Sequence, residues 1–268
     1  MRYGFIGLGN MASAIIRGMV GKGNFSAEAV YGFDPSPDAR AALAETAGIR
    51  TCQSNLEVVS NSEVVVLAVK PQIMSLVLAE IQTAPLEGKL FLSIAAGKDL
   101  DFLQKGLGAG LPIIRIMPNI NSRVGAASTC ISPNSAAESR HVQIARDIFT
   151  TIGTVFELPE AMIDVFMGIA SAAPAYSYIY IDALARAAVK FGMPKKLALE
   201  IAASQVYGSA KMVLESGEHP YDLVDQVCSP AGTTIEGVCA LQELGFAHAT
   251  HKAVEAAILR DRQLAGKK

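Results

Sequence analysis

The chain has 268 residues, of which 51% are hydrophobic and 18% charged, and its formal net charge is −2 at pH 7. This length suffices for a large buried core in one or two domains, and the slightly acidic balance argues against a nucleic-acid partner. No stretch reaches the roughly 18 uninterrupted apolar residues of a membrane span, so we expect no membrane partner. A strand pattern at the first residues leaves no room for a signal peptide. The four cysteines are widely spaced without a CxxC pair, which favours reduced thiols and a cytoplasmic location.

Strands and helices alternate through the first half of the chain. Short runs rich in β-branched residues predict strands at residues 3–7, 29–33, 63–69, 90–94, 113–117, 126–131 and 154–158. The run at 64–69 is apolar throughout, which is typical of strands buried on both faces of a parallel sheet. This alternation predicts a doubly wound α/β Rossmann domain over residues 1–159.

The first strand leads into a glycine-rich turn that reads Gly7-Leu8-Gly9-Asn10-Met11-Ala12. Gly7 suits the tight turn, Gly9 permits close backbone approach, and Ala12 keeps the following helix, predicted over 11–19, near the strand. The free N–H groups at this helix N-terminus favour the two negative phosphates of a dinucleotide. We therefore predict NADH or NADPH as cofactor, although an ordinary glycine-rich turn between a strand and a helix has the same pattern.

The second strand ends at Asp34, a position where an acidic side chain commonly accepts hydrogen bonds from the adenosine ribose. A carboxylate there repels a 2′-phosphate, which favours NADH over NADPH. The stretch Asp34-Pro35-Ser36-Pro37-Asp38 is equally a turn in which Asp34 caps the next helix.

Further cofactor contacts are expected where later strands end, because parallel strands present their carboxyl ends to the ligand crevice. The predicted residues are Ala68, Val69, Lys70 and Pro71, then Ala95 and Ala96, and finally Pro118 and Asn119. Asn119 is placed to fix the nicotinamide carboxamide or to orient the substrate. Lys70 is equally a solvated lysine at a strand end, and Asn119 a turn residue after proline.

The second half of the chain, residues 160–268, has a helical pattern without strands and is predicted to be a separate substrate-binding and dimerisation domain. Helices are expected at 162–191, ended by Gly192 and Pro194, and at about 195–216, 233–244 and 246–264. Several of these segments are apolar on more than one face, which a short bundle cannot bury alone. We therefore predict a homodimer through this domain.

A loop in the helical half combines small residues, hydroxyls and a helix start. Ser229-Pro230 interrupts one helix, Ala231 and Gly232 allow close backbone approach, and Thr233-Thr234 begins the next helix. Such a loop suits a substrate carboxylate. Serine and threonine also cap helices in the absence of any ligand, and that alternative stays open.

These motifs together resemble the delta-1-pyrroline-5-carboxylate reductases, and the resemblance spans essentially the whole chain. Its marks are the turn at 7–12, Val69-Lys70-Pro71, Arg115-Ile116-Met117-Pro118-Asn119, Pro174-Ala175-Tyr176 and the stretch from Ser229 to Glu236. The last of these is the most specific to the family. One departure is Ser171-Ala172-Ala173, where the family has glycines before Pro-Ala-Tyr.

The resemblance implies NAD(P)H-dependent reduction of the cyclic imine 1-pyrroline-5-carboxylate to L-proline, the last step of proline biosynthesis. It also implies an interwoven helical dimer, sometimes assembled into larger rings. In the family pattern the loop of Ser229, Ala231, Gly232, Thr233 and Thr234 grips the substrate carboxylate, and Thr234 lies near the ring nitrogen. A protonated imine is already a good electrophile, so no metal is expected, and the i,i+3 pair His248 and His251 has no evident third ligand.

Two other functions remain open on the sequence. A β-hydroxyacid dehydrogenase shares the plan of a Rossmann domain followed by helices and needs a catalytic lysine, for which Lys190 is the nearest candidate. A dinucleotide-sensing module that uses its helices for partner contact would bind NAD(P)H without turnover.

Overall fold

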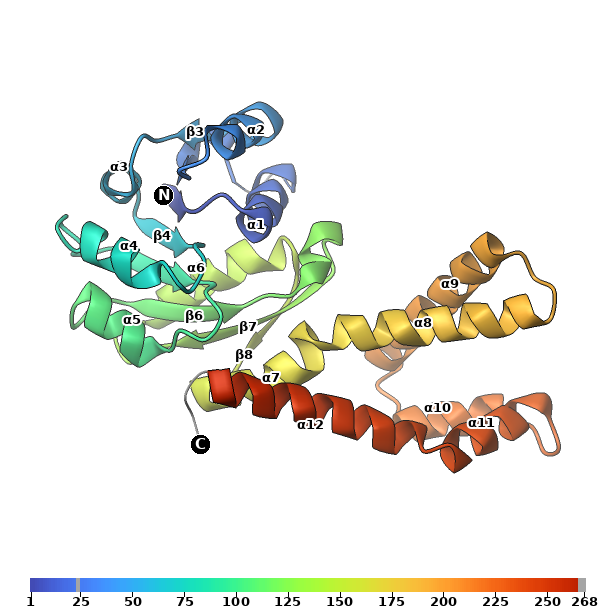
Figure 1. The fold of residues 1–268 in the computed structure, drawn as a ribbon. Coiled ribbons are helices and arrows are strands. Elements are labelled where there is room, and N and C mark those ends of the chain that lie inside the picture. Colours follow the sequence, from blue (N-terminus) through green and yellow to red (C-terminus); the bar gives the residue numbers. More distant parts are fainter. Residues whose placement is uncertain (23–24, 265–268) are drawn as a thin grey trace. The chain divides into compact units, whose positions relative to one another are not determined.

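The computed structural model describes residues 1–22 and 25–264 of the chain (Figure 1). The described residues pack into two compact units. Unit 1 contains Met1–Ser171 and the C-terminal residues from Ile258, and unit 2 contains Ala172–Ala257.

Unit 1 is built on one eight-stranded sheet with the order β3-β2-β1-β4-β5-β6-β7-β8. The strands are β1 (Tyr3–Ile6), β2 (Val30–Phe33), β3 (Arg50–Thr51), β4 (Val64–Leu67), β5 (Leu90–Ser93), β6 (Ile113–Met117), β7 (Ala127–Pro133) and β8 (Gly153–Glu157). All neighbouring strands are parallel except β6 and β7, which are antiparallel. From β1 the chain adds β2 and β3 on one side of the sheet and then returns to add β4, β5 and β6 on the other side. Doubly wound folds bind ligands at this switch point between β1 and β4.

Helices cover both faces of this sheet, and side chains of one strand alternate between the two faces. Val64 and Val66 of β4 pack in one core with α1 (Asn10–Gly21), α2 (Pro37–Ala47) and α6 (Ser139–Thr150). Val65 and Leu67 pack in a second core with α3 (Asn55–Asn61), α4 (Met74–Ile81) and α5 (Leu100–Leu107). Because every residue of β4 is buried, the uniformly apolar run in the sequence reflects burial on both faces.

The predicted fold class is confirmed, and the predicted strands match the observed ones to within about two residues at each end. The edge strand β3 is missing from the prediction because it has only two residues, Arg50 and Thr51, and both are exposed. The last strand begins at Gly153, where φ is +152°. A Cβ at Gly153 would lie 2.0 Å from the carbonyl oxygen of Ala127, so only glycine fits this close pairing of β7 and β8.

The single helix predicted over 162–191 is wrong in its details. The structure has a 3₁₀ turn (Glu160–Met162), α7 (Ile163–Phe166), a π-helical turn (Met167–Ser171) and α8 (Ala173–Lys190). Pro174 has no N–H to donate to the carbonyl of Ala170, four residues earlier. The side chain of Asn119 donates to that carbonyl instead, with 2.8 Å between Nδ2 and the oxygen. The change of helical winding therefore accompanies a hydrogen bond that proline leaves open.

Unit 2 consists of helices with a very small core. They are α8, α9 (Lys195–Ser216), α10 (Pro220–Val227), α11 (Thr233–Glu243) and α12 (Phe246–Leu264), whose last residues belong to unit 1. Its only cluster of buried side chains among the described residues consists of Ala185, Ala198 and Ala202. Helices of this length normally bury larger side chains, so the packing surface of unit 2 is incomplete within one chain.

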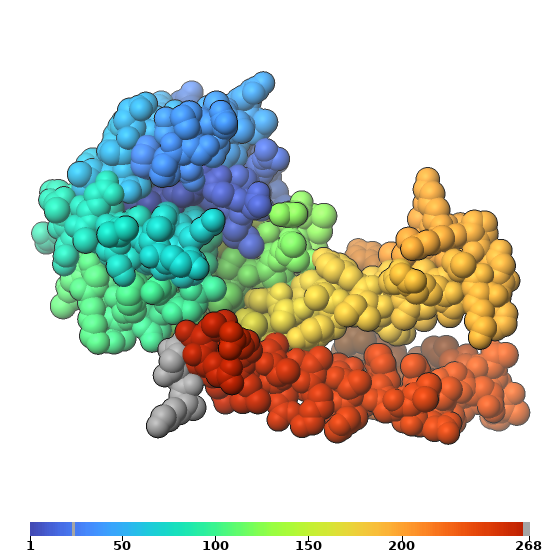
Figure 2. Space-filling view, viewed as in Figure 1, coloured from blue at the N-terminus to red at the C-terminus, as the bar shows by residue number. Residues whose placement is uncertain are grey.

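Large apolar side chains of unit 2 are exposed instead. The helices α8 and α9 that carry several of them are coloured yellow to orange in the space-filling view (Figure 2). Ile179 of α8 is 71% exposed, and Tyr207 and Leu214 of α9 are 72% and 83% exposed. The described stretch Glu160–Lys190 is long and apolar enough to cross a membrane, judged by length and composition alone. In its apolar segment of 18 residues, 17% is buried within the structure. A single helix of this kind is weak evidence for a membrane span, because helices that pack against other protein surfaces have the same composition.

The proposed domain boundary at residue 159 lies where the sheet ends along the chain, and packing extends unit 1 beyond it. Ile163 and Phe166 pack against Met117 and Cys130 of the sheet. Asp164 of α7 accepts a hydrogen bond from Arg262 of α12 at 2.6 Å. These contacts place residues 160–171 and the end of α12 with the sheet.

Candidate functional site

The glycine-rich turn after β1 has a geometry that requires glycine. Gly7 has φ of +93°, and a Cβ there would lie 2.8 Å from the carbonyl oxygen of Ala68. Its N–H donates to the carbonyl of Phe33 at 2.8 Å, which ties the turn to the end of β2. Any other residue at position 7 would therefore be strained by its own φ angle and by the backbone of the neighbouring strand end.

The N-terminus of α1 is left open by the same turn. Gly9 is the N-cap residue, and no side chain accepts a hydrogen bond from the first turn of the helix. A Cβ at Gly9 would meet no atom within 4 Å, so the space beside this backbone is empty. Ala12 is 1% exposed and packs into the core, which holds α1 close to the sheet. Unsatisfied N–H groups facing open space can receive the pyrophosphate of a dinucleotide.

Asp34 lies at the end of β2, and its carboxylate is bound to the glycine-rich turn. Its Oδ2 accepts from the N–H of Leu8 at 3.0 Å, and its Oδ1 accepts from the N–H of Ser36 at 2.9 Å. Arg40 donates to the Asp34 carbonyl at 2.6 Å, and Ser36 rather than Asp34 caps α2. The alternative that Asp34 is the helix cap is therefore wrong, and its carboxylate instead ties the glycine-rich turn to the segment before α2. Its contact with the cofactor ribose stays a prediction.

The other predicted cofactor residues lie at strand ends along one edge of the sheet. Ala68 and Val69 are partly buried, Lys70 is exposed, Ala95 is 4% exposed, and Ala96 is exposed. The register pairs Ile6 with Leu67 and Leu67 with Ser93, so β1, β4 and β5 end at the same level. The structure thus brings Gly7, Ala68 and Ala95 to one edge, as the ligand crevice of a doubly wound sheet requires.

Asn119 is buried, at 5% exposure, and both ends of its amide are occupied within the protein. Its Nδ2 donates to Ala170, and its Oδ1 accepts from the N–H of Asn121 at 3.2 Å. These two hydrogen bonds fix the loop that follows β6. A direct contact from the Asn119 side chain to the cofactor stays a prediction.

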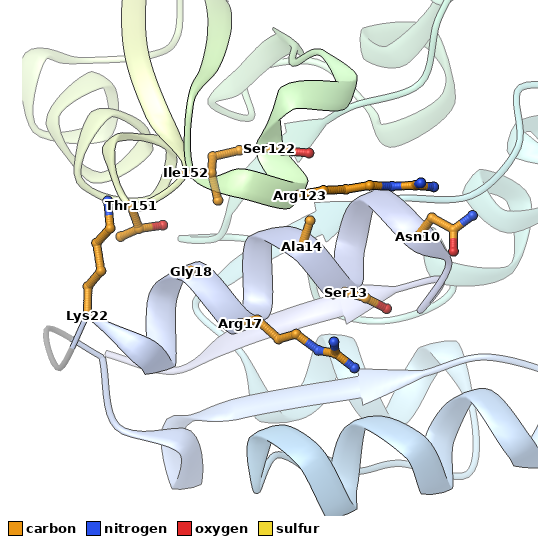
Figure 3. Close-up of a pocket in the computed structure, with 11 residues that line it drawn as sticks. Asn10, Ser13, Ala14, Arg17, Gly18, Lys22, Ser122, Arg123, Thr151 and Ile152 are labelled. Atoms are coloured by element: carbon orange, nitrogen blue, oxygen red, sulfur yellow. The ribbon is translucent and has the colours of Figure 1, made fainter. Parts of the chain in front are cut away.

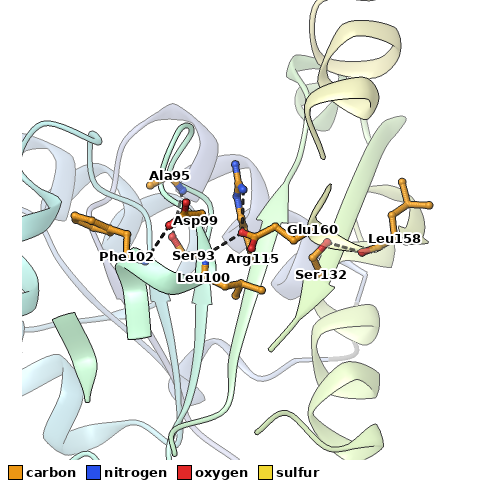
Figure 4. A network of polar contacts seen from close by, with 9 residues as sticks. All are labelled: Ser93, Ala95, Asp99, Leu100, Phe102, Arg115, Ser132, Leu158 and Glu160. Carbon is orange, nitrogen blue, oxygen red and sulfur yellow. Dashed lines mark hydrogen bonds and ion pairs between the residues drawn. The ribbon is translucent and has the colours of Figure 1, made fainter. Parts of the chain in front are cut away.

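A buried ion pair beside β5 was not predicted from the sequence (Figure 4). Arg115 of β6 donates to Glu160 at 2.9 Å, and the Arg115 side chain is only 6% exposed. The same Glu160 oxygen accepts from the N–H of Leu100 at 2.8 Å. A single arginine inside the apolar strand Ile113–Met117 was the available signal, since buried charges need partners. Glu160 therefore ties the segment that follows β8 to β6 and to the start of α5.

The predicted substrate loop forms a tight turn in unit 2. The N–H of Gly232 donates to the carbonyl of Ser229 at 3.0 Å, and Ala231 has φ of +56°. Proline at the second position and positive φ at the third describe a type II turn, in which glycine is preferred over alanine. Gly232 is the N-cap of α11 and has no side-chain cap, and a Cβ there would lie 2.3 Å from Ser229 Oγ.

Among the predicted substrate-loop residues, Thr234 is the one that lines a hollow of unit 2. Thr234 lines a mostly apolar hollow of about 570 Å³ that is bounded by α9, α10 and α11, and Cys228 lines the same hollow. Ser229, Ala231 and Thr233 are exposed around the start of α11 and do not line this hollow. Thr234, in the first turn of α11, is exposed like these residues and borders the hollow as well.

Residues that would support other functions are exposed on their helices. Lys190 is exposed in the last turn of α8, and His248 and His251 are exposed on α12. The described residues contain no group of three or more potential metal ligands. Of the cysteines, Cys52 and Cys130 are buried, and burial raises the pKa of the Cys52 thiol to about 11.

The fold and the open cradle define the class: a dinucleotide-binding oxidoreductase with an additional helical domain. Residues 2–97 match the family model described as "NADP oxidoreductase coenzyme F420-dependent". Residues 160–264 match the model described as "Pyrroline-5-carboxylate reductase dimerisation".

Full-length relatives then identify the family. The chain is 41% identical over 263 residues to pyrroline-5-carboxylate reductase of Escherichia coli, and the match covers 98% of both chains. It is 39% identical to the enzyme of that name from Methanosarcina acetivorans, over 100% of this chain and 98% of the relative. The chain belongs to the pyrroline-5-carboxylate reductase family.

Solved structures agree with this assignment. A pyrroline-5-carboxylate reductase from Coxiella burnetii has a TM-score of 0.94 at 31% identity, covering 100% of this chain and 98% of the other. A pyrroline carboxylate reductase from Plasmodium falciparum with NADP bound has a TM-score of 0.88 at 30% identity, covering 99% and 98%.

Proposed function

We propose that this chain reduces 1-pyrroline-5-carboxylate to L-proline with NADH or NADPH, the last step of proline biosynthesis. The observation that carries the proposal is the full-length family match, combined with an open α1 N-terminus beside a glycine whose φ is +93°. The exposed Lys190 at the end of α8 gives no support to the competing β-hydroxyacid dehydrogenase function.

The residues at the end of β1 fit the dinucleotide. Gly7 makes the turn, Gly9 leaves space for the pyrophosphate, and the N-terminus of α1 offers N–H groups and a favourable dipole. When bound, the nicotinamide supplies the hydride that adds to the imine carbon. The protein contributes positioning and electrostatics, because a protonated imine needs no strong acid or metal to accept a hydride.

We assign the substrate carboxylate to the loop of Ser229, Ala231, Gly232 and Thr233. The N-cap Gly232 lacks a side-chain cap, so the first N–H groups of α11 are available to an anion. Thr234 donates a hydrogen bond to the ring nitrogen as it becomes an amine. A hydroxyl is a weak acid at neutral pH, so Thr234 acts by orientation and polarity rather than as the proton source.

Replacement of Thr234 by alanine tests this assignment. We expect kcat/KM for the imine to fall roughly ten-fold, the size expected for one lost hydrogen bond, while the dissociation constant for NAD(P)H stays unchanged. The matched control is Thr250→Ala on α12, whose hydroxyl donates to the Phe246 carbonyl at 2.9 Å within its own helix. Unchanged kinetics in Thr234→Ala, or an equal loss in both variants, would contradict the assigned role.

The chain acts as a homodimer through its helical half, and we propose that dimers assemble further into rings in the cytoplasm. The alanine-only core of unit 2 and the exposed apolar residues of α8 and α9 support the dimer. The match of residues 160–264 to a dimerisation model points to the same surface.

A further inference from the structure

A groove of about 590 Å³ runs along one side of α1 in unit 1 (Figure 3). Three cationic side chains line it: Arg17 of α1, Lys22 at the C-cap of that helix, and Arg123 of the 3₁₀ helix Ile120–Val124. None of the described residues that line it is acidic. We call this feature the basic groove, and no step of the proposed reduction uses it.

The wall of the basic groove is fixed by close packing. A Cβ at Gly18 of α1 would lie 2.6 Å from Cγ2 of Ile152, so the absence of a side chain lets the end of α6 approach this helix. Ile152 is 1% exposed and belongs to the main core of unit 1. The groove is therefore a feature of the packed fold rather than of a single surface loop.

Three hydroxyl groups that line the groove donate hydrogen bonds to acceptors inside the protein. The Ser13 hydroxyl donates to Leu8 at 3.3 Å, the Ser122 hydroxyl to Met11 Sδ at 3.4 Å, and the Thr151 hydroxyl to Ile148 at 2.6 Å. The side-chain donors left for an occupant are the exposed Asn10 amide and the three cations. Arg17 gives one N–H to Thr46 at 3.3 Å, and a guanidinium has five N–H donors.

The two ends of the groove differ in electrostatics. The side chains of Arg17 and Arg123 both extend toward the end formed by Asn10 and Ser13, and Lys22 points toward Thr151 at the other end (Figure 3). Two guanidinium groups therefore reach one end of the groove, and a single ammonium group lies at the other. The anionic group of an occupant is therefore favoured at the end of Arg17 and Arg123.

We propose that the basic groove binds a small organic phosphate, whose phosphoryl groups are neutralised by the cationic side chains of Arg17 and Arg123 along its length. Guanidinium groups match phosphate geometry, and the volume falls within the range of about 300–1,000 Å³ typical of sites for small organic molecules. Inorganic phosphate alone would leave most of the groove empty. Because Asn10 borders both the groove and the dinucleotide cradle, the occupant weakens cofactor binding through like-charge repulsion without displacing the cofactor.

Isothermal titration of the full-length chain with fructose 1,6-bisphosphate tests this proposal, with fructose as the uncharged control. We expect the bisphosphate to bind, fructose not to bind, and the Arg17→Gln/Arg123→Gln double variant to bind about ten-fold more weakly or worse. The matched control is Arg50→Gln/Arg140→Gln, which removes two exposed arginines of unit 1 outside the groove and keeps wild-type affinity. Thermal unfolding and cofactor titration of each variant show that unit 1 is intact.

A second titration, with the chain saturated by oxidised cofactor, separates the groove from the cradle. The proposal expects bisphosphate binding to persist and to weaken only a few-fold. It is overturned if cofactor abolishes bisphosphate binding, if both double variants lose affinity equally, or if the wild type binds no bisphosphate. These readouts need no turnover, so they are independent of whether the chain reduces the imine.

Discussion

At the scale of single residues, Asp34 shows how one carboxylate serves two neighbours. It accepts from Leu8 in the glycine-rich turn and from Ser36 at the start of α2, so it shapes the cradle before any ligand arrives. We expect its negative charge to repel the 2′-phosphate of NADPH. The guanidinium of Arg40 lies beside Asp34, because it donates to the Asp34 carbonyl. Its Cζ also lies 5.5 Å from the centroid of the Phe33 ring.

Replacing Asp34 by serine tests which of these charges decides the cofactor preference. We expect the wild type to prefer NADH, and Asp34→Ser to shift the NADH/NADPH ratio of kcat/KM at least ten-fold toward NADPH, since the repelling carboxylate is removed while Arg40 stays. Steady-state kinetics with both cofactors measure this ratio. The same change at the exposed Asp101, paired with Lys105 on α5, serves as control. A wild type that prefers NADPH would show that the Asp34 charge does not control the choice.

Residues also mark the limit of prediction from sequence. Gly7 and Asp34 were predicted because a strand, a turn and a helix are local patterns. Asn119 was predicted as a cofactor residue, and its engagement with Ala170 joins positions 51 apart in the chain, which no local pattern encodes. The partner of Arg115 was equally hidden, because Glu160 lies 45 positions away.

At the scale of elements, the helices of unit 1 begin at identifiable caps. Ser36, Ser54 and Asp99 cap α2, α3 and α5 with their side chains. At α6 the N-cap is Glu138, whose N–H donates to Nδ1 of His141 at 3.0 Å. This capping bond requires a neutral imidazole nitrogen, so the start of α6 is sensitive to pH.

The pH dependence of stability follows from this cap. Burial, followed by the charge of Arg140, lowers the pKa of His141 below its ordinary value of 6.5. The unfolded chain then binds more protons in the window between the two pKa values. Stability from this group is therefore present above about pH 6.5 and is lost as pH falls through the lowered pKa. Thermal unfolding from pH 8 to 5 should show a smaller acid-side loss in His141→Ala than in the wild type. Parallel curves would contradict the capping role.

Prediction at this scale succeeded where the local pattern was strong. The strand β4 was assigned from its uninterrupted apolar run, which reflects burial on both faces, and α1 from the glycine-rich turn that precedes it. The two-residue β3 has no such pattern. The π-helical turn at Met167–Ser171 escaped prediction, and the hydrogen bond that accompanies it, from Asn119 to Ala170, is a tertiary contact.

At the scale of the whole molecule, the exposed apolar surface of unit 2 indicates that one chain is not the functional unit. Ile179 of α8 is 71% exposed, although isoleucine is among the residues most often buried. We expect Ile179→Lys to shift the sedimentation coefficient from dimer to monomer and to abolish turnover. NAD(P)H binding to the Rossmann domain should remain. The control Leu76→Lys alters an equally exposed residue, at 73%, on α4 of unit 1 and should leave the dimer intact. A dimeric Ile179→Lys would place the interface elsewhere.

The central claim is reduction of the cyclic imine, and the most direct test follows loss of NADH or NADPH absorbance with two substrates in parallel. With 1-pyrroline-5-carboxylate we predict rapid cofactor oxidation and formation of one L-proline for each cofactor consumed. With a β-keto acid we predict no turnover. Turnover with the keto acid alone would move the catalytic assignment from the Ser229–Thr234 loop to Lys190 and contradict the account.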